Sequence, residues 1–411
     1  MLPHLPFFDV LAAADEGLPV WAPTLAGLAV LSILESARAD RSIIDSDWTG
    51  MKAVSDTVSA LREGSPLRRP MLTVLERLRD EGPDWGSVNQ ALFAYGRALD
   101  LEGHWTLAAD VFATVADLAR EERDAALAIE ATTALGGAAR RSGDWDRSAN
   151  SYAAAAHLAD ALGDKASGLT VQVGTANTHV ARGNLPAARM ILDEVIREAG
   201  KSALDGVEAL ALHGRATVAH HQGEFAESVS FAYRALEKTT NPTAADAIQA
   251  DIAAAFMELG LHEAARDSYL VVSATSRQQW VRWQATLNLM ELAAIDGMEA
   301  AFDAYAKQLK NAALDPRLRS YFLLYYGRGA LTFGREAEGL ASIREAQEFA
   351  AEHKIHQVAH EAAQALVSGS RATPAVAPVV TELPGYVHEV AEAMSQRRDL
   401  ALSASRDAGW H

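Results

Sequence analysis

The 411-residue sequence contains no cysteine. Disulfide bonds, thiol nucleophiles and metal sites built on thiolates are therefore excluded together. Stability has to come from the packing of apolar side chains, and hydrophobic residues make up 49% of the chain, which is ample for a core. Charged residues, at 22%, are at an ordinary level, so most of the chain is expected to fold.

Long hydrophobic runs are also missing. The most apolar stretch, Leu25 to Leu34, is too short to cross a hydrocarbon layer of about 30 Å. The first fifteen residues lack the basic start of a signal peptide and carry Asp9 and Asp15. We therefore expect a cytoplasmic protein.

Positive charge is scarce relative to negative charge. The 37 Lys and Arg residues are set against 54 Asp and Glu residues, which gives a formal net charge of −17. Because nucleic-acid binding needs a basic surface to neutralise phosphates, we expect no nucleic-acid partner. An acidic surface favours solubility and basic or neutral partners.

Glycine, in contrast, is placed with a regular spacing. Seven glycines mark the repeat: Gly103, Gly143, Gly183, Gly223, Gly260, Gly297 and Gly334. Successive glycines are 40 residues apart from Gly103 to Gly223 and 37 residues apart from Gly223 to Gly334. Self-similarity at a period of this size is the signature of a repeat array.

The residues on either side of each glycine have the spacing of amphipathic helices. Tyr95 and Leu99 precede Gly103, and Leu107 and Val111 follow it, at the i, i+4 spacing of a helix face. Glycine at the junction supplies a left-handed C-cap, so the chain can reverse into a second helix. Strand patterns are almost absent, and the sequence predicts an all-α fold of helix pairs.

The residues within each pair resemble the tetratricopeptide repeat (TPR) family. That family's pattern of Leu-Gly-x₂-Tyr followed by Ala-x₃-Phe has counterparts in Leu92-x₂-Tyr95-Gly96-x₂-Leu99, Ala108-x₃-Phe112 and Ala265-x₃-Tyr269. Over residues 85 to 350 the chain is similar to long-period arrays of the kinesin light chain type and of bacterial peptide-pheromone receptors. The resemblance implies a right-handed α-solenoid of antiparallel helix pairs, a TPR-like superhelix.

The sequence departs from the family pattern in three ways. Its period is longer than that of the family, which is about 34 residues. The closing proline is missing from every repeat, and Phe302 occupies the small position of repeat six. The longer period predicts longer helices or longer loops between repeats.

The organisation predicted along the chain has four parts. Residues 1–84 hold an irregular segment, up to residue 23, and capping helices, one of them starting at Thr24 as its N-cap. Residues 85–368 form the array of about seven helix pairs with a final capping helix. Residues 369–385 are a linker rich in Pro, Ala and Ser, and residues 386–411 form a C-terminal helix and tail. We expect this last helix to dock on a helical surface, because its apolar stripe needs burial.

Sites for chemistry are not apparent. Gly200-Lys201-Ser202 is similar to the end of a phosphate-binding loop, but Val195 stands where the loop needs glycine, and a helix end is favoured. His356 and His360 have metal-ligand spacing without a further ligand, so an exposed helix face is favoured. We predict no catalytic residue, no cofactor and no metal site.

The resemblance also implies where a partner binds. In the family, the first helix of each pair lines the concave face, at fixed positions before the turn glycine. Carried over by that register, the peptide- or protein-binding groove consists of Arg97, Glu130, Arg140, Arg141, Asn177, His213, Thr217, His220, His221, Gln284, Tyr321 and Arg328. Leu287 and Glu291 share the register in repeat six, and repeat five contributes only Ala247, Ala250 and Ala254. The alternative is that these side chains form the solvated inner surface of a superhelix.

Function follows from this groove. We expect a non-enzymatic scaffold or regulatory receptor that grips a protein or peptide segment with acidic groups or a free carboxylate, mainly at repeats two to four. Arginine forks match carboxylates in geometry. Two alternatives stay open: a structural subunit of a larger assembly, and an enzyme with an unrecognised site. We expect no membrane partner, and the oligomeric state stays open.

Overall fold

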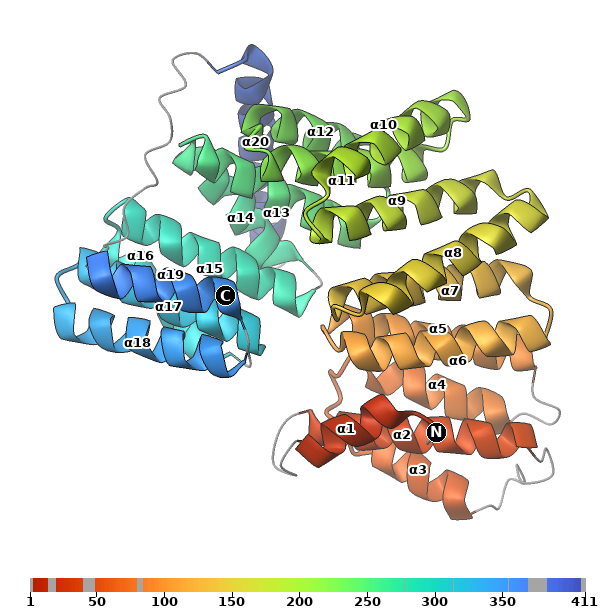
Figure 1. Ribbon diagram of the computed structural model, residues 1–411. Helices are drawn as coiled ribbons and strands as arrows, with labels where there is room; N and C mark the ends of the chain where they lie inside the picture. The colour runs from red at the N-terminus through yellow and green to blue at the C-terminus, as the bar shows by residue number, and fades with distance from the viewer. Residues whose placement is uncertain are drawn as a thin grey trace. The chain divides into compact units, whose positions relative to one another are not determined.

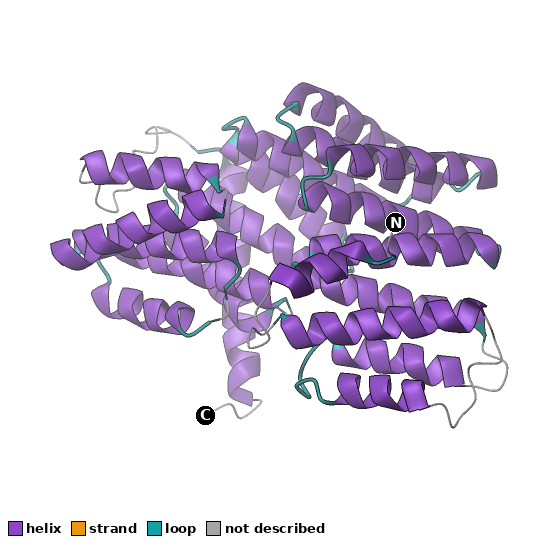
Figure 2. Cartoon of the chain, turned by 60° about the horizontal axis from the view of Figure 1, so that its bottom comes forward, coloured by secondary structure: helices purple, strands orange, loops and turns teal. Residues whose placement is uncertain are grey.

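The computed structural model describes residues 3–13, 20–39, 49–79, 84–276, 278–312, 314–353, 355–368 and 383–407. Within these ranges the chain forms twenty α-helices. Figures 1 and 2 show helices joined by loops, with no strand in the described part of the chain. The predicted all-α class is confirmed. The chain divides into two compact units, residues 1–191 and 192–411, which we call the N-terminal unit and the C-terminal unit. No helix in the described ranges combines the length and apolar character that a membrane span requires.

The N-terminal unit begins with four helices and continues with helix pairs. The first four are α1 (Leu5–Ala13), α2 (Trp21–Ala39), α3 (Thr49–Ser59) and α4 (Arg68–Arg79). The pairs are α5 (Trp85–Leu101) with α6 (Trp105–Glu121), and α7 (Ala125–Arg141) with α8 (Trp145–Leu162), followed by α9 (Lys165–Ala181). Helix α10 (Leu185–Lys201) spans the boundary between the units. Neighbours along the chain pack on each other from α1 to α9.

The C-terminal unit continues the same arrangement. Its pairs are α11 (Asp205–His221) with α12 (Phe225–Lys238), α13 (Pro242–Glu258) with α14 (His262–Thr275), α15 (Gln279–Ile295) with α16 (Glu299–Lys310), and α17 (Pro316–Thr332) with α18 (Glu336–Glu352). Helices α19 (His356–Ser368) and α20 (Gly385–Asp407) follow. We call α5, α7, α9, α11, α13, α15 and α17 the first helices, and their even-numbered partners from α6 to α18 the second helices.

The turns within the pairs lie at the predicted glycines. All seven have a positive φ, between 70° and 84°. A side chain strains this backbone region, so glycine stabilises the reversal. The turns between repeats show a second series that sequence reasoning missed: Arg123, Gly163 and Ala203, which are spaced at the same step as the first four glycines, have φ values of 61°, 65° and 53°. A search for regularly spaced glycines could not find this series, because only one of its three members is glycine.

Helix length explains the two periods. Each first helix from α5 to α17 has 17 residues. The second helices α6 and α10 also have 17, whereas α12 and α14 have 14. The step becomes shorter in the later repeats because the second helices α12 and α14 are three residues shorter, nearly one turn, and α16, with 12 residues, is shorter still.

Small residues let the two helices of a pair approach closely, as the pattern predicts. A Cβ atom at Gly96 would lie 2.7 Å from the Phe112 ring, inside contact distance. In repeat six, where Phe302 takes the small position, the next first helix supplies the space instead. A Cβ at Gly329 would lie 2.2 Å from the buried Phe302 ring.

The chain ends differ from the prediction in two places. The irregular course expected for residues 1–23 is wrong for Leu5–Ala13, which is helix α1, and helix α2 starts at Trp21. Pro6 and Pro23 lie in the first turns of these helices, where no backbone N–H is needed. Thr24 is therefore not an N-cap; it lies inside α2 and its hydroxyl donates to the Val20 carbonyl at 2.7 Å.

The C-terminal helix docks on a helical surface, as expected, and this surface belongs to its own unit. Helix α20, dark blue in Figure 1, packs against the second helices α12 and α14. Val387, Val390 and Met394 are buried in that contact, and Arg398 pairs with the buried Asp267 carboxylate at 2.7 Å. The predicted linker falls mostly outside the described residues.

Candidate functional site

The predicted binding residues occupy the face of the first helices that is turned away from the second helices. None of the twelve is fully buried, whereas the opposite sides of the same helices form the core. This exposure follows from the helical register, because positions three, six, ten and thirteen before the turn glycine share one side. Five of the twelve lie in the N-terminal unit and seven in the C-terminal unit.

In the N-terminal unit a tyrosine of a second helix holds an arginine on this face. Tyr152 of α8 is 5% exposed and lies against Gly136 of α7 and Gly174 of α9, where added Cβ atoms would lie 2.9 Å and 2.3 Å from its ring. Its hydroxyl hydrogen-bonds Arg140. Burial lowers the pKa of Arg140, and the adjacent Arg141 adds to this. Burial also raises the pKa of Tyr152, so the phenol stays neutral.

The second arginine of this pair is bound to a neighbouring helix. Arg141 forms an ion pair with Asp100 at the end of α5. A Cβ at Gly137 would lie 3.6 Å from the guanidinium of Arg141 and 3.6 Å from the hydroxyl of Tyr152, so the three groups form one cluster. The arrangement fixes two cationic side chains side by side at the C-terminal end of α7.

Three further predicted residues flank this cluster without a bound partner. Arg97 of α5 and Glu130 of α7 are exposed, and Asn177 of α9 is half-buried. Among the described residues none of them has an ion pair or a hydrogen bond from its side chain. Arg97 is therefore a cation free to meet a ligand.

In the C-terminal unit the predicted histidines face acidic residues that sequence reasoning left out. His213 of α11 lies 2.7 Å from the carboxylate of Asp251 on α13. His220 lies near Asp251 and Glu258, but burial outweighs their charges and lowers its pKa. Repeat five, which was expected to present only alanines, thus contributes two carboxylates. Glu258 could have been found, because it stands two residues before Gly260, in the register used for the other repeats.

Of the remaining predicted residues, Arg328 is coupled to a desolvated glutamate, Glu291. Burial raises the pKa of Glu291 on α15 to about 7; Arg328 opposes this shift, and Glu361 and Glu258 add to it. Arg328 of α17 lies 3.7 Å from Glu361 of α19. Tyr321 is half-buried on α17 near Glu361, and Gln284 and His221 are exposed, with Thr217 donating to the His213 carbonyl.

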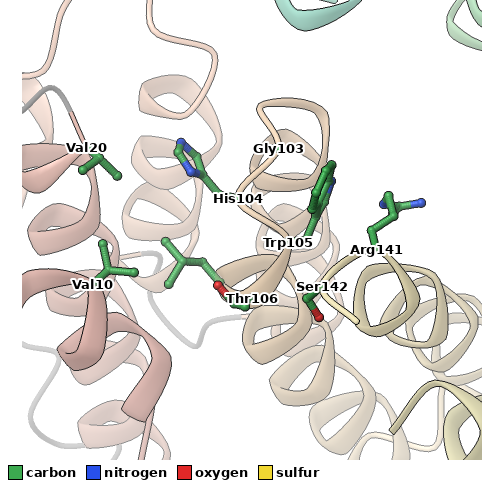
Figure 3. Close-up of a pocket in the computed structure, with 9 residues that line it drawn as sticks. Val10, Val20, Gly103, His104, Trp105, Thr106, Arg141 and Ser142 are labelled. Carbon is green, nitrogen blue, oxygen red and sulfur yellow. The ribbon is translucent and has the colours of Figure 1, made fainter. Parts of the chain in front are cut away.

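The N-terminal unit has two surface pockets. One, of about 350 Å³, lies at the turn between α5 and α6, where His104 and Trp105 stand between Val10 on one side and Arg141 on the other, as Figure 3 shows. Burial lowers the pKa of His104, so its ring is neutral. The other, of about 510 Å³, lies between α4 and α5 and reaches Ala94, which stands one turn before Arg97.

Comparisons with known proteins concern the fold. No protein-family model matches the sequence, and no curated protein matches it significantly. Among solved structures, NprR in complex with its cognate peptide NprX is 14% identical, with a TM-score of 0.49, over 80% of this chain and 97% of that one. The apo form of RapI is 11% identical, with a TM-score of 0.43, over 84% of this chain and 99% of that one. BtubC (BKLC) from P. vanneervenii is 13% identical, with a TM-score of 0.34, over 65% and 92%. At these identities and scores no function transfers to this chain.

The helices themselves show a TPR-like solenoid. In this architecture, the first-helix face is the surface with exposed side chains that could contact a ligand. The N-terminal unit offers cations, and the C-terminal unit offers carboxylates. In the described ranges no group of three or more His, Asp or Glu side chains is arranged to hold a metal ion. Lys201 ends helix α10 and lies 3.3 Å from Glu198, as the helix-end interpretation of Gly200-Lys201-Ser202 predicts.

Proposed function

We propose that the chain is a non-enzymatic binding protein, and that the first-helix face of its N-terminal unit grips an acidic segment or free carboxylate of a partner protein or peptide. The observation that carries this proposal is the group of Arg97, Arg140 and Arg141 on neighbouring first helices. These three arginines outnumber Asp100 and Glu130 on the same helices, so a local excess of positive charge attracts anions although the chain as a whole has a net charge of −17.

The cluster has features that suit a carboxylate. Arg140 is held by the Tyr152 hydroxyl, so less side-chain entropy is lost when it binds a ligand. Arg141 is shared with Asp100, whereas Arg97 has no competing acid in the described part of the chain. Asn177 adds an amide that can bond to a peptide backbone. The histidines of α11 face Asp251 and Glu258, so we assign the acidic ligand to the N-terminal unit alone.

The experiment is calorimetric titration with hexaglutamate, once with a free C-terminal carboxylate and once as the amide. The double variant Arg97→Gln with Arg140→Gln should weaken binding at least about tenfold, the equivalent of roughly 1.4 kcal/mol. Arg140→Glu together with Arg141→Glu should abolish it, because repulsion replaces attraction.

The matched control is Arg38→Gln with Arg120→Gln. It removes the same charge from α2 and the second helix α6, where both arginines form exposed ion pairs that contribute little to stability. We expect this control to bind as the parent does. Equal loss from both double variants, or no binding of either peptide by the parent, would favour the structural-subunit alternative.

A further inference from the structure

Four carboxylates of the C-terminal unit lie on the first helices α13 and α15 and on the capping helix α19. We call these four residues the acidic strip: Asp251 and Glu258 of α13, Glu291 of α15, and Glu361 of α19. Helices α13 and α15, α15 and α17, and α17 and α19 are in contact, so the strip crosses consecutive elements. Glu291 links its two ends, since its charge is coupled to both Glu258 and Glu361.

The cations beside the strip do not balance it. Arg328 is the basic residue coupled to Glu291, and it lies 3.7 Å from Glu361. His213 pairs with Asp251, but it bears charge only when it is protonated. Glu258 is exposed, and among the described residues no ion pair neutralises it.

A buried tyrosine hydroxyl interacts electrostatically with three of the four carboxylates of the strip. Tyr269 of the second helix α14 is 1% exposed, and its hydroxyl forms no hydrogen bond of standard geometry, although Asn288 lies beside it. The charges that act on this hydroxyl are those of Asp251, Glu291 and Glu258. A buried hydroxyl without a full set of partners is costly. Because this hydroxyl lies within the field of the carboxylates, it is a candidate acceptor for a cation that binds to them.

Aromatic rings line the other side of the strip. Tyr321 and Tyr325 of α17 lie with their ring centroids 5.7 Å apart, and Tyr325 is coupled to both Glu291 and Glu361. Carboxylates beside tyrosine faces are the combination that binds ammonium and guanidinium groups, through charge and cation–π attraction.

We propose that the acidic strip binds the Lys or Arg side chains of a basic segment in a partner protein or peptide. The strip supplies paired acceptors for the N–H donors, Tyr269 supplies a further acceptor, and Tyr321 with Tyr325 supplies aromatic surface. A bound cation offsets the mutual repulsion of carboxylates that the free protein leaves uncompensated. This site is independent of the proposed acidic-ligand site, which lies in the other unit.

The proposal has a pH signature. Glu291 has a pKa of about 7 in the free protein, so it is largely neutral at pH 6 and largely ionised at pH 8. A cation prefers the ionised form, so affinity should rise between these values. The groups facing Glu291 and its neighbours are Arg328 and Tyr325 on α17, Glu361 on α19, Glu258 on α13, Tyr269 on α14, and His220 on α11, which faces Glu258. Burial lowers the pKa of His220, and a proton that it gains at low pH adds positive charge beside Glu258 and so weakens cation binding in the same direction.

The test is calorimetric titration of the full chain with N-acetylated hexalysine amide at 150 mM salt. The triple variant Glu258→Gln, Glu291→Gln and Glu361→Gln should lose at least about tenfold in affinity. The control triple variant is Glu263→Gln, Glu336→Gln and Glu348→Gln, which removes the same charge from exposed positions on the second helices α14 and α18. We expect the control to change affinity less than twofold, so a loss specific to the strip excludes a general effect of net charge.

Two further measurements separate an effect on the acidic strip from misfolding and from an effect on the acidic-ligand site. The single variant Glu258→Gln changes an exposed side chain and leaves the fold intact, so a threefold or larger loss from it alone supports the proposal if the triple variant misfolds. Arg97→Gln with Arg140→Gln should leave hexalysine binding unchanged, and the strip triple should leave hexaglutamate binding unchanged. Equal losses from the strip and control triples, no loss from Glu258→Gln, or affinity that falls between pH 6 and pH 8 would overturn the proposal.

Discussion

Gly174 of helix α9 is the position where one methyl group should disturb the N-terminal unit most clearly. A Cβ there would lie 2.3 Å, 2.5 Å and 2.8 Å from the Cε1, Cζ and hydroxyl oxygen of Tyr152. All three distances are shorter than real carbon contacts, so the ring has to move. Its escape is blocked on the other side, because Gly136 also lies against the ring.

The expected magnitude combines two opposing effects. Overpacking of a filled core costs about 1–3 kcal/mol, and replacing a helical glycine with alanine contributes about 1 kcal/mol in favour of the helix. Because Tyr152 is fixed between two helices, we expect an overpacking cost near the upper end of that range, about 3 kcal/mol. Subtracting the gain in helix propensity of about 1 kcal/mol, Gly174→Ala should destabilise the unit by about 2 kcal/mol.

The same helix offers a matched control. At Gly168 the nearest atom to an added Cβ is the Ala159 Cβ at 4.0 Å, an ordinary contact. Gly168→Ala should therefore stabilise α9 by up to about 1 kcal/mol through helix propensity alone. The two alanine variants should thus differ in sign, by roughly 3 kcal/mol in total.

The assay is urea denaturation followed by circular dichroism, with hydrogen exchange of α8 and α9 to locate the effect. Tyr152→Leu combined with Gly174→Ala should cost less than the sum of the single variants, because the smaller side chain makes room. If both alanine variants stabilise, or if Gly174→Ala is no worse than Gly168→Ala, the close packing of Tyr152 between two glycines is refuted.

Three other predictions follow from single features of the structure. Ala203 has a φ of 53°, so Ala203→Gly should raise the free energy of unfolding by up to about 1 kcal/mol, and a loss on urea denaturation would contradict the strain. Burial lowers the pKa of His4, but Asp110 at 2.6 Å and Glu35 at 3.3 Å outweigh this and raise it above 6.5. The stability that His4 adds over His4→Gln should therefore be present below pH 6.5 and disappear as pH rises through the raised pKa, and a difference that grows with pH would refute the assignment. Met394 of α20 is fully buried where this helix packs against α12 and α14. Met394→Ala should therefore weaken the docking of α20 by about 2–5 kcal/mol and speed its hydrogen exchange, and unchanged exchange would contradict this packing.

Much of the architecture could be predicted from the sequence because helix pairs are local. The turn at Gly103 joins two helices that pack directly on each other, so a glycine and two apolar stripes are sufficient to define the pair. The same register placed Arg97 and Asn177 on the accessible side of their helices. Local patterns failed at α1, where Pro6 suggested an irregular segment but occupies a first turn that tolerates it.

The sequence by itself thus determined the repeats, their turns and the exposed side of each first helix. Only the tertiary structure decided what those exposed side chains meet. Asp251 reaches His213 from the next first helix along the chain, and the hydroxyl of Tyr269, on a second helix, interacts with the charges of Asp251 and Glu258. Helix periodicity sets the direction of a side chain from its own helix, but the charges around it depend on which neighbouring helices pack beside it and at what height. That is why repeat five, which was expected to present only alanines, contributes the carboxylates of Asp251 and Glu258.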